Sequence, residues 1–155
     1  MRKLTVIISL FFILASLGLN GQNIVTKTDG VYFDENDRPY SGLYKEFYEN
    51  GNIKLEMPLR RGVKNGEVRL YFENGAINEI RSYRSGKMDG NWTTWDDSGN
   101  KVAQAIYKKG LKDGKWYIWD ENGTLRYDMH YRKGERTGNW LMFDENEELV
   151  MEQSY

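Results

Sequence analysis

The sequence predicts an all-β protein, an elongated antiparallel meander of stacked hairpin repeats. The first observation is a glycine that recurs every 24 residues, at Gly42, Gly66, Gly90, Gly114 and Gly138. The second is an alternation of apolar and polar residues with a period of two, which is typical of half-buried strands. The third is a turn motif of the type Asp-x-Asn-Gly, complete at 120–123 and present in variant form at 48–51, 72–75, 96–99 and 144–147, which is typical of hairpin turns. A fixed period indicates repeated units, each of which needs its neighbour to bury its faces.

The N-terminal segment has the pattern of a secretory signal peptide. Residues 1–3 are basic after the initiator, residues 4–19 are an apolar run broken only by small residues, and the chain turns polar at Asn20. We expect a signal-peptide helix over residues 1–21, with cleavage near Gly21. An uncleaved membrane anchor stays open, although the run is shorter than the ~20 apolar residues that a spanning helix needs. The chain has no Cys, so a lipoprotein is excluded.

Residues 22–41 are expected to form a polar lead-in and a truncated hairpin that caps the array. Residues 31–33 have the composition of a short strand. Residues 34–37 resemble the later hairpin turns, with Asp37 in the place of the glycine. An atypical end unit is expected of a repeat protein.

Five hairpin repeats follow, at 42–65, 66–89, 90–113, 114–137 and 138–155. Each is expected to contain a strand, a turn, a second strand and a second turn. In the fourth repeat these are strand 115–120, turn 120–123, strand 124–131 and turn 132–138. No segment beyond the N-terminal one has a helical period longer than about one turn, so we expect no helix there.

The hairpin turn of the fourth repeat allows two registers. Asp120, Asn122 and Gly123 favour a type I turn followed by a left-handed glycine bulge. A two-residue Asn-Gly turn stays open and would exchange the faces of the second strand. In the bulged form we expect these residues to share one face: Tyr117, Trp119, Leu125 and Tyr127, and in the fifth repeat Leu141, Phe143, Leu149 and Met151.

No combination of residues indicates a catalytic, cofactor or metal site. The single histidine, His130, falls in the polar phase of its strand, and the serines lie at turns or strand ends without a histidine in the same repeat. Acidic residues gather at the hairpin turns, where Asp and Asn favour turn formation. A ladder of calcium ions is the alternative, although the spacing does not match a calcium-binding loop. We therefore expect no catalytic residue, no cofactor and no metal.

The aromatic residues are the best candidates for contact with a partner. A three-residue offset in a strand changes sides, so Trp92, Trp116 and Trp140 should lie on one face. Trp95, Trp119 and Phe143 should lie on the other. One layer cannot bury both of its faces fully, and exposed aromatic patches tend to mark interaction sites. The alternative is that these rings bury one another along the sheet.

The formal net charge of −1 argues against a nucleic-acid binder. The charges should nevertheless separate, with acidic residues along one edge of the sheet and basic residues along the other. The expected basic edge comprises Arg60, Arg61, Lys64, Arg84, Lys87, Lys108, Lys109, Lys112, Arg132, Lys133 and Arg136. Such an edge can dock an anionic partner, including lipid head groups, or can simply keep the protein soluble.

The repeat resembles the MORN-repeat variant found in bacterial proteins, some of which are labelled YwqK-type antitoxin components. The resemblance rests on Gly-x-x-x-Gly-x-Trp-x-x-aromatic-Asp-x-Asn-Gly, as at Gly110 to Gly123, followed by a tyrosine such as Tyr131. It covers about residues 31–155. Departures include Val68 in the tryptophan position and Glu147 in the last glycine position. The resemblance implies a hairpin array that contacts proteins or lipid head groups.

These observations predict an exported, non-enzymatic repeat protein that binds a protein partner in the cell envelope, periplasm or outside the cell. An antitoxin or immunity protein that neutralises a cognate toxin is the alternative. A signal peptide fits poorly with an antitoxin of the cytoplasm but is compatible with an exported immunity protein. We expect neither nucleic acid nor a small-molecule substrate as a ligand.

Overall fold

The computed structural model describes residues 26–155, which form strands and turns without any helix. The prediction of an all-β antiparallel meander is therefore confirmed. The expected signal peptide and the first residues of the lead-in lie outside the described residues. Within the described range, no helix is long and apolar enough to cross a membrane.

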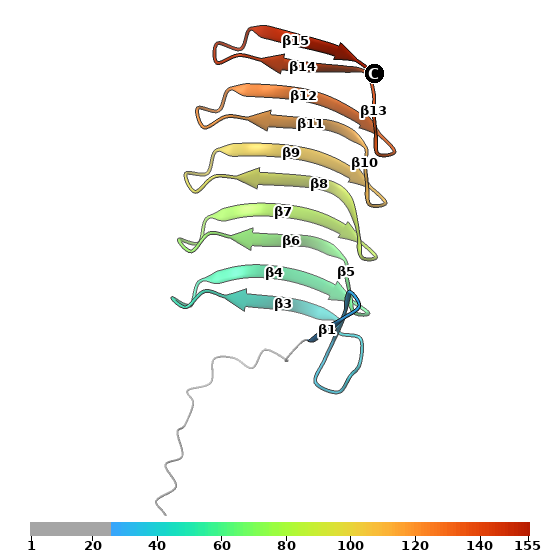
Figure 1. The fold of residues 1–155 in the computed structure, drawn as a ribbon. Helices are drawn as coiled ribbons and strands as arrows, with labels where there is room; N and C mark the ends of the chain where they lie inside the picture. The colour runs from blue at the N-terminus through green and yellow to red at the C-terminus, as the bar shows by residue number, and fades with distance from the viewer. Residues whose placement is uncertain (1–25) are drawn as a thin grey trace, which may run out of the picture.

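The sheet is a meander in which the strands of five hairpins follow one another in sequence order (Figure 1). The first strands of the hairpins are β3 (Gly42–Phe47), β6 (Gly66–Tyr71), β8 (Lys87–Trp95), β11 (Gly114–Trp119) and β14 (Asn139–Phe143). The second strands are β4 (Ile53–Arg60), β7 (Ile77–Arg84), β9 (Lys101–Lys108), β12 (Leu125–Arg132) and β15 (Leu149–Ser154). Three short strands also belong to this sheet: β5 (Val63–Lys64), β10 (Leu111–Lys112) and β13 (Glu135–Arg136), which pair with β4, β9 and β12. β1 (Thr26–Thr28) and β2 (Val31–Phe33) form a separate two-stranded sheet.

The hairpin turn within each repeat has the bulged form that the sequence favours. In the fourth repeat the Gly123 N–H donates to the Asp120 carbonyl at 3.0 Å, and the Asp120 N–H donates to the Thr124 carbonyl at 3.0 Å. Gly123 has a φ of 82°, a left-handed conformation that glycine adopts without steric cost. The two-residue turn, the alternative that the sequence left open, is therefore not the one that forms.

A second bulge follows directly and overturns part of the predicted faces. Trp119 pairs with Leu125, but Ile118 pairs with Tyr127, so β12 contributes one extra residue to the ladder. Tyr127 therefore lies on the face opposite Leu125. A bulge inserts a residue on one strand only, and the side chains beyond it change sides.

The fifth repeat has the same bulge and requires the same correction. Phe143 pairs with Leu149, and Met142 pairs with Met151. Met151 thus lies opposite Leu141, Phe143 and Leu149 rather than beside them.

Tight two-residue turns join one repeat to the next. In the turn after β9, Lys109 and Gly110 both have positive φ, 52° and 88°, and Lys108 pairs with Leu111, which defines a type I′ hairpin. The Gly110 N–H donates to the Met88 carbonyl of the preceding repeat at 2.7 Å. Figure 1 shows each of these turns lying against the one before it.

A side chain also ties each tight turn to the preceding one. The acceptors recur every 24 residues, and each receives the N–H of the residue 20 positions later: Ser41 from Arg61, Asn65 from Ser85, Asp89 from Lys109 and Asp113 from Lys133. These hydrogen bonds span 2.8–3.2 Å. They stack the turns along one edge of the sheet and so position the basic residues found there.

The N-terminal unit packs on the first repeat. Its strands β1 and β2 pair through a turn at Asp29. The sequence indicated only a polar lead-in before β2. Asp37 adopts a positive φ of 56°, in the place that glycine holds in later turns. Tyr32 and Tyr40 pack against a cluster of buried side chains, Met57, Leu59 and Val68. This contact covers part of the apolar surface of the first two repeats.

Candidate binding surfaces

One face of the sheet, here called the aromatic face, carries the larger rings at the middle and tight-turn end of each hairpin. Strand register places on it Tyr44, Val68, Trp92, Trp116 and Trp140 from the first strands, and Leu59, Tyr83, Tyr107, Tyr131 and Tyr155 from the second strands. The other face, here called the opposite face, carries Phe47, Tyr71, Trp95, Trp119 and Phe143. The two predicted rows of aromatic residues thus lie on different sides of the sheet.

The rings of the aromatic face form a continuous ladder along repeats three to five. Ring centroids lie 5.3 Å apart for Tyr107 and Trp116, 5.1 Å for Trp116 and Tyr131, 5.1 Å for Tyr131 and Trp140, and 5.0 Å for Trp140 and Tyr155. Tilted rings at this separation attract one another more strongly than the burial of their apolar area alone would predict. The rings therefore hold successive repeats together, whatever else they contact.

Two of the three tryptophans on this face also have their indole N–H groups bound to the backbone. Trp116 donates to the Ile106 carbonyl at 3.2 Å, and Trp140 donates to the His130 carbonyl at 3.0 Å. The Trp92 indole nitrogen is buried without a hydrogen-bond partner among residues 26–155. Each of the three side chains is half-buried, which leaves part of every ring accessible.

Burial is concentrated on the aromatic face. The buried side chains of the described range all belong to it: Met57, Leu59, Val68, Glu79, Ala105, Tyr107 and Met129. On the opposite face, Trp95, Trp119 and Phe143 are half-buried, and Phe47 is 51% exposed. The meander sheet therefore has one well-packed face and one more accessible face.

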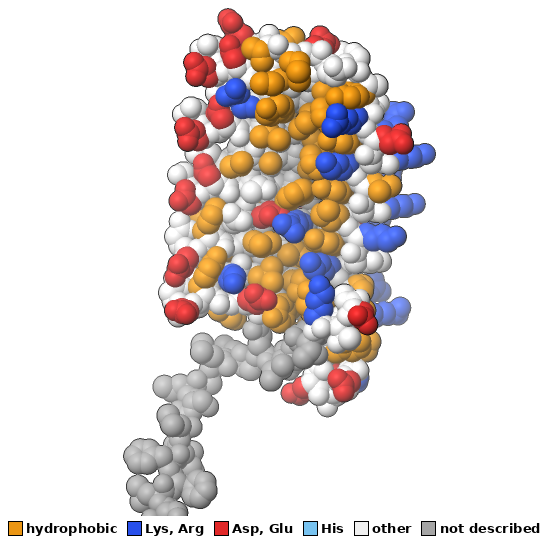
Figure 2. Space-filling view, in the orientation of Figure 1, with side chains coloured by type: hydrophobic (Ala, Val, Ile, Leu, Met, Phe, Trp, Pro, Cys, Tyr) orange, Lys and Arg blue, Asp and Glu red, His pale blue; other side chains and the backbone are white. Residues whose placement is uncertain are grey.

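The charged residues separate along the two edges of the sheet. In Figure 2, acidic side chains gather along the edge of the Asp-x-Asn-Gly turns, and basic side chains gather along the edge of the tight turns. A stripe of hydrophobic side chains runs between them along the array. Of the predicted basic edge, these residues are exposed at the tight turns: Arg60, Arg61, Arg84, Lys87, Lys108, Lys109, Arg132 and Lys133.

Three members of the predicted basic edge instead lie over the rings of the aromatic face. The Lys112 ammonium is 4.2 Å from the Trp116 ring centroid, and the Lys64 ammonium is 4.9 Å from that of Tyr83. The Arg136 guanidinium is 4.6 Å from the Trp140 centroid. A cation over an aromatic face is attracted by the ring quadrupole. These three residues therefore belong to the aromatic face as much as to the edge.

An apolar hollow of about 210 Å³ opens on the aromatic face in the third repeat. Ala103 and Ala105 form its floor, and Trp92, Trp116 and Ile118 stand around it. The hollow exists because both floor residues are alanines. The first and fourth repeats carry larger side chains at the same two positions, Leu55 with Met57 and Tyr127 with Met129. The sequence analysis missed this hollow, although two small residues among large counterparts were a usable signal.

The first aspartate of the later hairpin turns accepts hydrogen bonds from the backbone of its own turn. The Asp96 carboxylate accepts the N–H groups of Ser98 and Asn100 at 3.0 and 2.8 Å. The hydrogen bond from the Asn100 backbone is the main cause that lowers the pKa of Asp96. The Glu148 backbone lowers the pKa of Asp144 in the same way. No group of three or more His, Cys, Asp or Glu side chains within residues 26–155 is placed to hold a metal ion.

The repeat geometry agrees with a known family. The family model described as MORN repeat variant matches residues 40–60, 64–85, 88–109 and 112–133, and each match spans one hairpin. The matches cover more than half of the chain, which therefore belongs to the MORN repeat variant family. No curated protein matches the chain. The hairpin of β14 and β15 lies beyond the four matches and continues the same ladder of rings.

Membership of this family defines the general class of the protein. MORN repeat proteins are generally non-enzymatic binding modules, and their repeats mediate contacts with proteins or membrane lipids. The two faces and the basic edge are accordingly the surfaces on which a binding function has to be sought.

Proposed function

We propose that this protein is an exported, non-enzymatic binding module that docks an extended segment of a partner protein across the aromatic face. The hollow over Ala103 and Ala105 is the observation that carries the proposal. It is the one place along the described ladder of rings where two tryptophans flank a floor of small residues. A pocket bordered by Trp is the kind of site that accepts an apolar anchor side chain.

Two further features support a protein partner. The aromatic face offers apolar area interrupted by cations, among them Lys112 and Arg136, so it can bind a segment of mixed apolar and acidic character. Repeats of the family to which the chain belongs generally mediate contacts with proteins or membrane lipids. The ladder runs across several strands, which suits an extended segment better than a compact small molecule.

The hollow can be tested by filling it with the side chain that neighbouring repeats use. Met57 and Met129 occupy the position equivalent to Ala105, so Ala105→Met is compatible with the fold. We expect this variant to keep or raise its melting temperature and to lose at least about tenfold in affinity for the partner, because the anchor is excluded. Gln153→Met is the matched control, because it introduces the same side chain at the equivalent position of the fifth repeat. Partner binding that survives in Ala105→Met would remove the hollow from the proposed site.

The partner would be captured from the native cell envelope with the wild-type chain and measured against both variants. Envelope proteins held through the hollow would support a scaffolding role. A toxin held through the hollow would assign the alternative function, an exported immunity protein.

Export is part of the proposal and rests on residues 1–21, whose basic start and apolar run are typical of a signal peptide. We expect the mature protein from the native host to begin near Gln22 or Asn23, as N-terminal sequencing would show. An intact Met1 on soluble cytoplasmic protein would contradict both export and an envelope location.

A further inference from the structure

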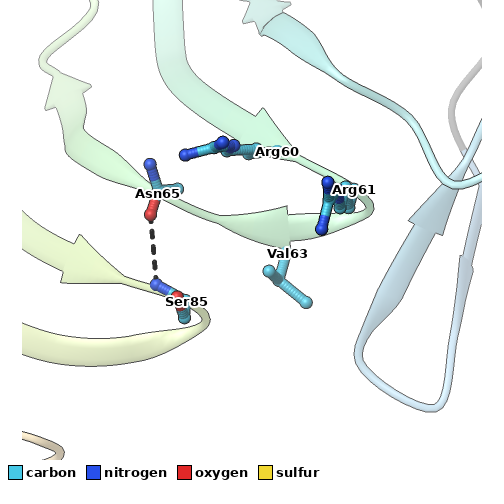
Figure 3. A pocket seen from close by; sticks show the side chains of 5 residues that line it. All are labelled: Arg60, Arg61, Val63, Asn65 and Ser85. Carbon is cyan, nitrogen blue, oxygen red and sulfur yellow. Dashed lines mark hydrogen bonds between the residues drawn. The ribbon is translucent and has the colours of Figure 1, made fainter.

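A recess of about 290 Å³ lies between the first two tight turns of the array, on the basic edge and away from the hollow. It is lined by Arg60, Arg61, Val63, Asn65 and Ser85, which Figure 3 shows from close by. Arg60 ends β4, Arg61 lies in the tight turn, Val63 belongs to β5 and Asn65 follows β5, whereas Ser85 comes from the next tight turn. The stacking of tight turns thus brings two arginines, an amide and a hydroxyl to one place.

The donors of this recess outnumber its acceptors. The Asn65 side-chain oxygen accepts the Ser85 N–H at 3.2 Å, so the amide NH₂ is left facing the recess (Figure 3). The Arg60 guanidinium extends toward that NH₂ group. Neither Arg60 nor Arg61 forms an ion pair with any residue of the range 26–155. Donors that converge without an acceptor between them define a site for an anion.

The next repeat shows what the recess lacks. Arg84 and Asp89 are the counterparts of Arg60 and Asn65, one period later. The Arg84 guanidinium lies 3.7 Å from the Asp89 carboxylate, which also accepts the Lys109 N–H at 3.1 Å. The Asp89 carboxylate therefore both binds the backbone of the next tight turn and neutralises the charge of Arg84. Asn65 holds its turn in the same way but has no charge to offer Arg60.

The serine keeps the recess open. The residue at this position of the other tight turns is Arg61, Lys109 or Lys133, and only here is it the short Ser85. A long side chain at this position would stand over the space between the two turns. Ser85 instead leaves the space open and adds a hydroxyl group that can donate a hydrogen bond.

We propose that Arg60, Arg61, Asn65 and Ser85 form a binding site for a dianionic phosphate group. Two guanidinium groups without a carboxylate supply two positive charges, and a phosphate monoester carries about −1.5 to −2 at neutral pH. Arginine also matches the geometry of phosphate oxygens through paired N–H groups. A ligand with a single carboxylate could pair with Arg60, as Asp89 pairs with Arg84, but it would leave the charge of Arg61 uncompensated. The site is solvated, so its affinity should fall as salt is added.

The test is an NMR titration of the full chain with inorganic phosphate, with acetate as the monoanionic comparison. We expect saturable shifts at Ser85, Asn65 and the two arginine Nε–H groups, with phosphate binding more tightly than acetate. Equal binding of the two anions, or an absence of saturation with phosphate, would overturn the assignment.

Two matched pairs of variants separate the site from general attraction to the basic edge. Asn65→Asp should weaken phosphate binding about tenfold or more, because a carboxylate there pairs with Arg60 as Asp89 pairs with Arg84. Thr137→Asp places the same charge at the equivalent position three periods away and should have little effect. Likewise, Arg60→Gln with Arg61→Gln should abolish binding, and Lys108→Gln with Lys109→Gln should not. Equal losses within either pair would show that only the charge of the edge matters.

The source of the phosphate is distinguished by a second comparison. The chain is tested against soluble glycerol 3-phosphate and against phosphatidylcholine vesicles that contain phosphatidic acid. Binding to the soluble ester that depends on Asn65 assigns a soluble ligand. Binding confined to the vesicles, with the same dependence, assigns a lipid head group. Vesicle binding that Asn65→Asp leaves unchanged would count against the site.

Discussion

Trp116 and Trp119 lie on the same strand, three residues apart and on opposite faces of one sheet. The Trp116 ring contacts the rings of Trp92, Tyr107 and Tyr131 at centroid distances of 6.2, 5.3 and 5.1 Å, and its indole N–H is bound to the backbone. The Trp119 ring contacts the ring of Tyr117 at 5.6 Å and the Lys101 ammonium at 5.4 Å. The same residue type therefore has very different surroundings on the two faces.

The difference arises from the side chains that the neighbouring strands place beside each tryptophan. On the aromatic face, tyrosines from the second strands stand between the tryptophans of the first strands. On the opposite face, the residues paired with Trp119 and Trp95 are Leu125 and Lys101, which are not aromatic. A one-layer sheet thus obtains a packed face from the alternation of rings between its own strands, without a second layer.

The largest expected effect comes from removing a ring of the packed face. Trp116→Ala should destabilise the protein by roughly 3 kcal/mol, because several ring contacts and a satisfied N–H are lost together. Trp119→Ala should cost roughly 1 kcal/mol, since fewer contacts depend on it. Urea unfolding of both variants measures the two values. Similar losses would show that the two faces contribute equally to stability.

The next largest effect is expected at the turn that sets the register between the faces. Gly123→Val should cost about 1–3 kcal/mol, because a β-branched residue resists the left-handed conformation. Beyond the adjoining residues of the chain, no heavy atom lies within 4 Å of the position of an added Cβ, so the cost is one of backbone conformation rather than collision. Glu121→Ala, in the same turn, should stay within about 0.5 kcal/mol. Equal melting temperatures for the two variants would contradict the assigned turn.

A smaller effect is expected from the cations over the rings. Lys112→Ala should destabilise the protein by about 0.5–1 kcal/mol, because its ammonium group lies over Trp116 and Tyr131. Lys108→Ala removes an exposed lysine at the same edge and should change stability by less than about 0.5 kcal/mol. Chemical denaturation at low and high salt provides the comparison. A loss in Lys112→Ala no greater than that in Lys108→Ala would count against the cation–ring contact.

The smallest effect is expected at the acidic edge, as a dependence on pH. The folded-state pKa values of Asp96 and Asp144 are lowered from the ordinary 3.8, chiefly by backbone hydrogen bonds from Asn100 and Glu148. Their ionised forms therefore stabilise the fold above that ordinary value. This contribution is lost as the pH falls through the lowered pKa values.

The measurement is the unfolding midpoint as a function of pH, for the wild type and for a variant with Asp96→Asn and Asp144→Asn. The amide oxygens can still accept the turn N–H groups but do not titrate in this range. We expect a shallower loss of stability on acidification in the variant. An unchanged acid slope would show that other groups dominate the acid response.

Much of the array follows from the sequence because its determinants are local and periodic. Gly123 and Asp120 specify their turn through backbone conformation and short-range hydrogen bonds. Related turn residues recur in register along the chain, with Asp at 96 and 144 and Gly at 51, 75 and 99. The three-residue offset within a strand places Trp116 and Trp119 on different faces whatever the neighbours are. The number of hairpins, the antiparallel order, the two aromatic rows and the two charged edges could all be predicted on these grounds.

Only the tertiary structure decided which residues lie together beyond the bulge and between the repeats. Tyr127 and Met151 change faces because of how their strands pair with β11 and β14, and strand composition alone does not reveal that pairing. The hollow over Ala105 exists because the side chains there are smaller than those at the equivalent positions of other repeats. The recess beside Arg60 exists because the next tight turn, 24 residues later, brings Ser85 against it. Contacts of this kind are set by the register and stacking of whole hairpins. The sequence period therefore predicts the order of strands in the sheet, but it does not predict the hollow or the recess.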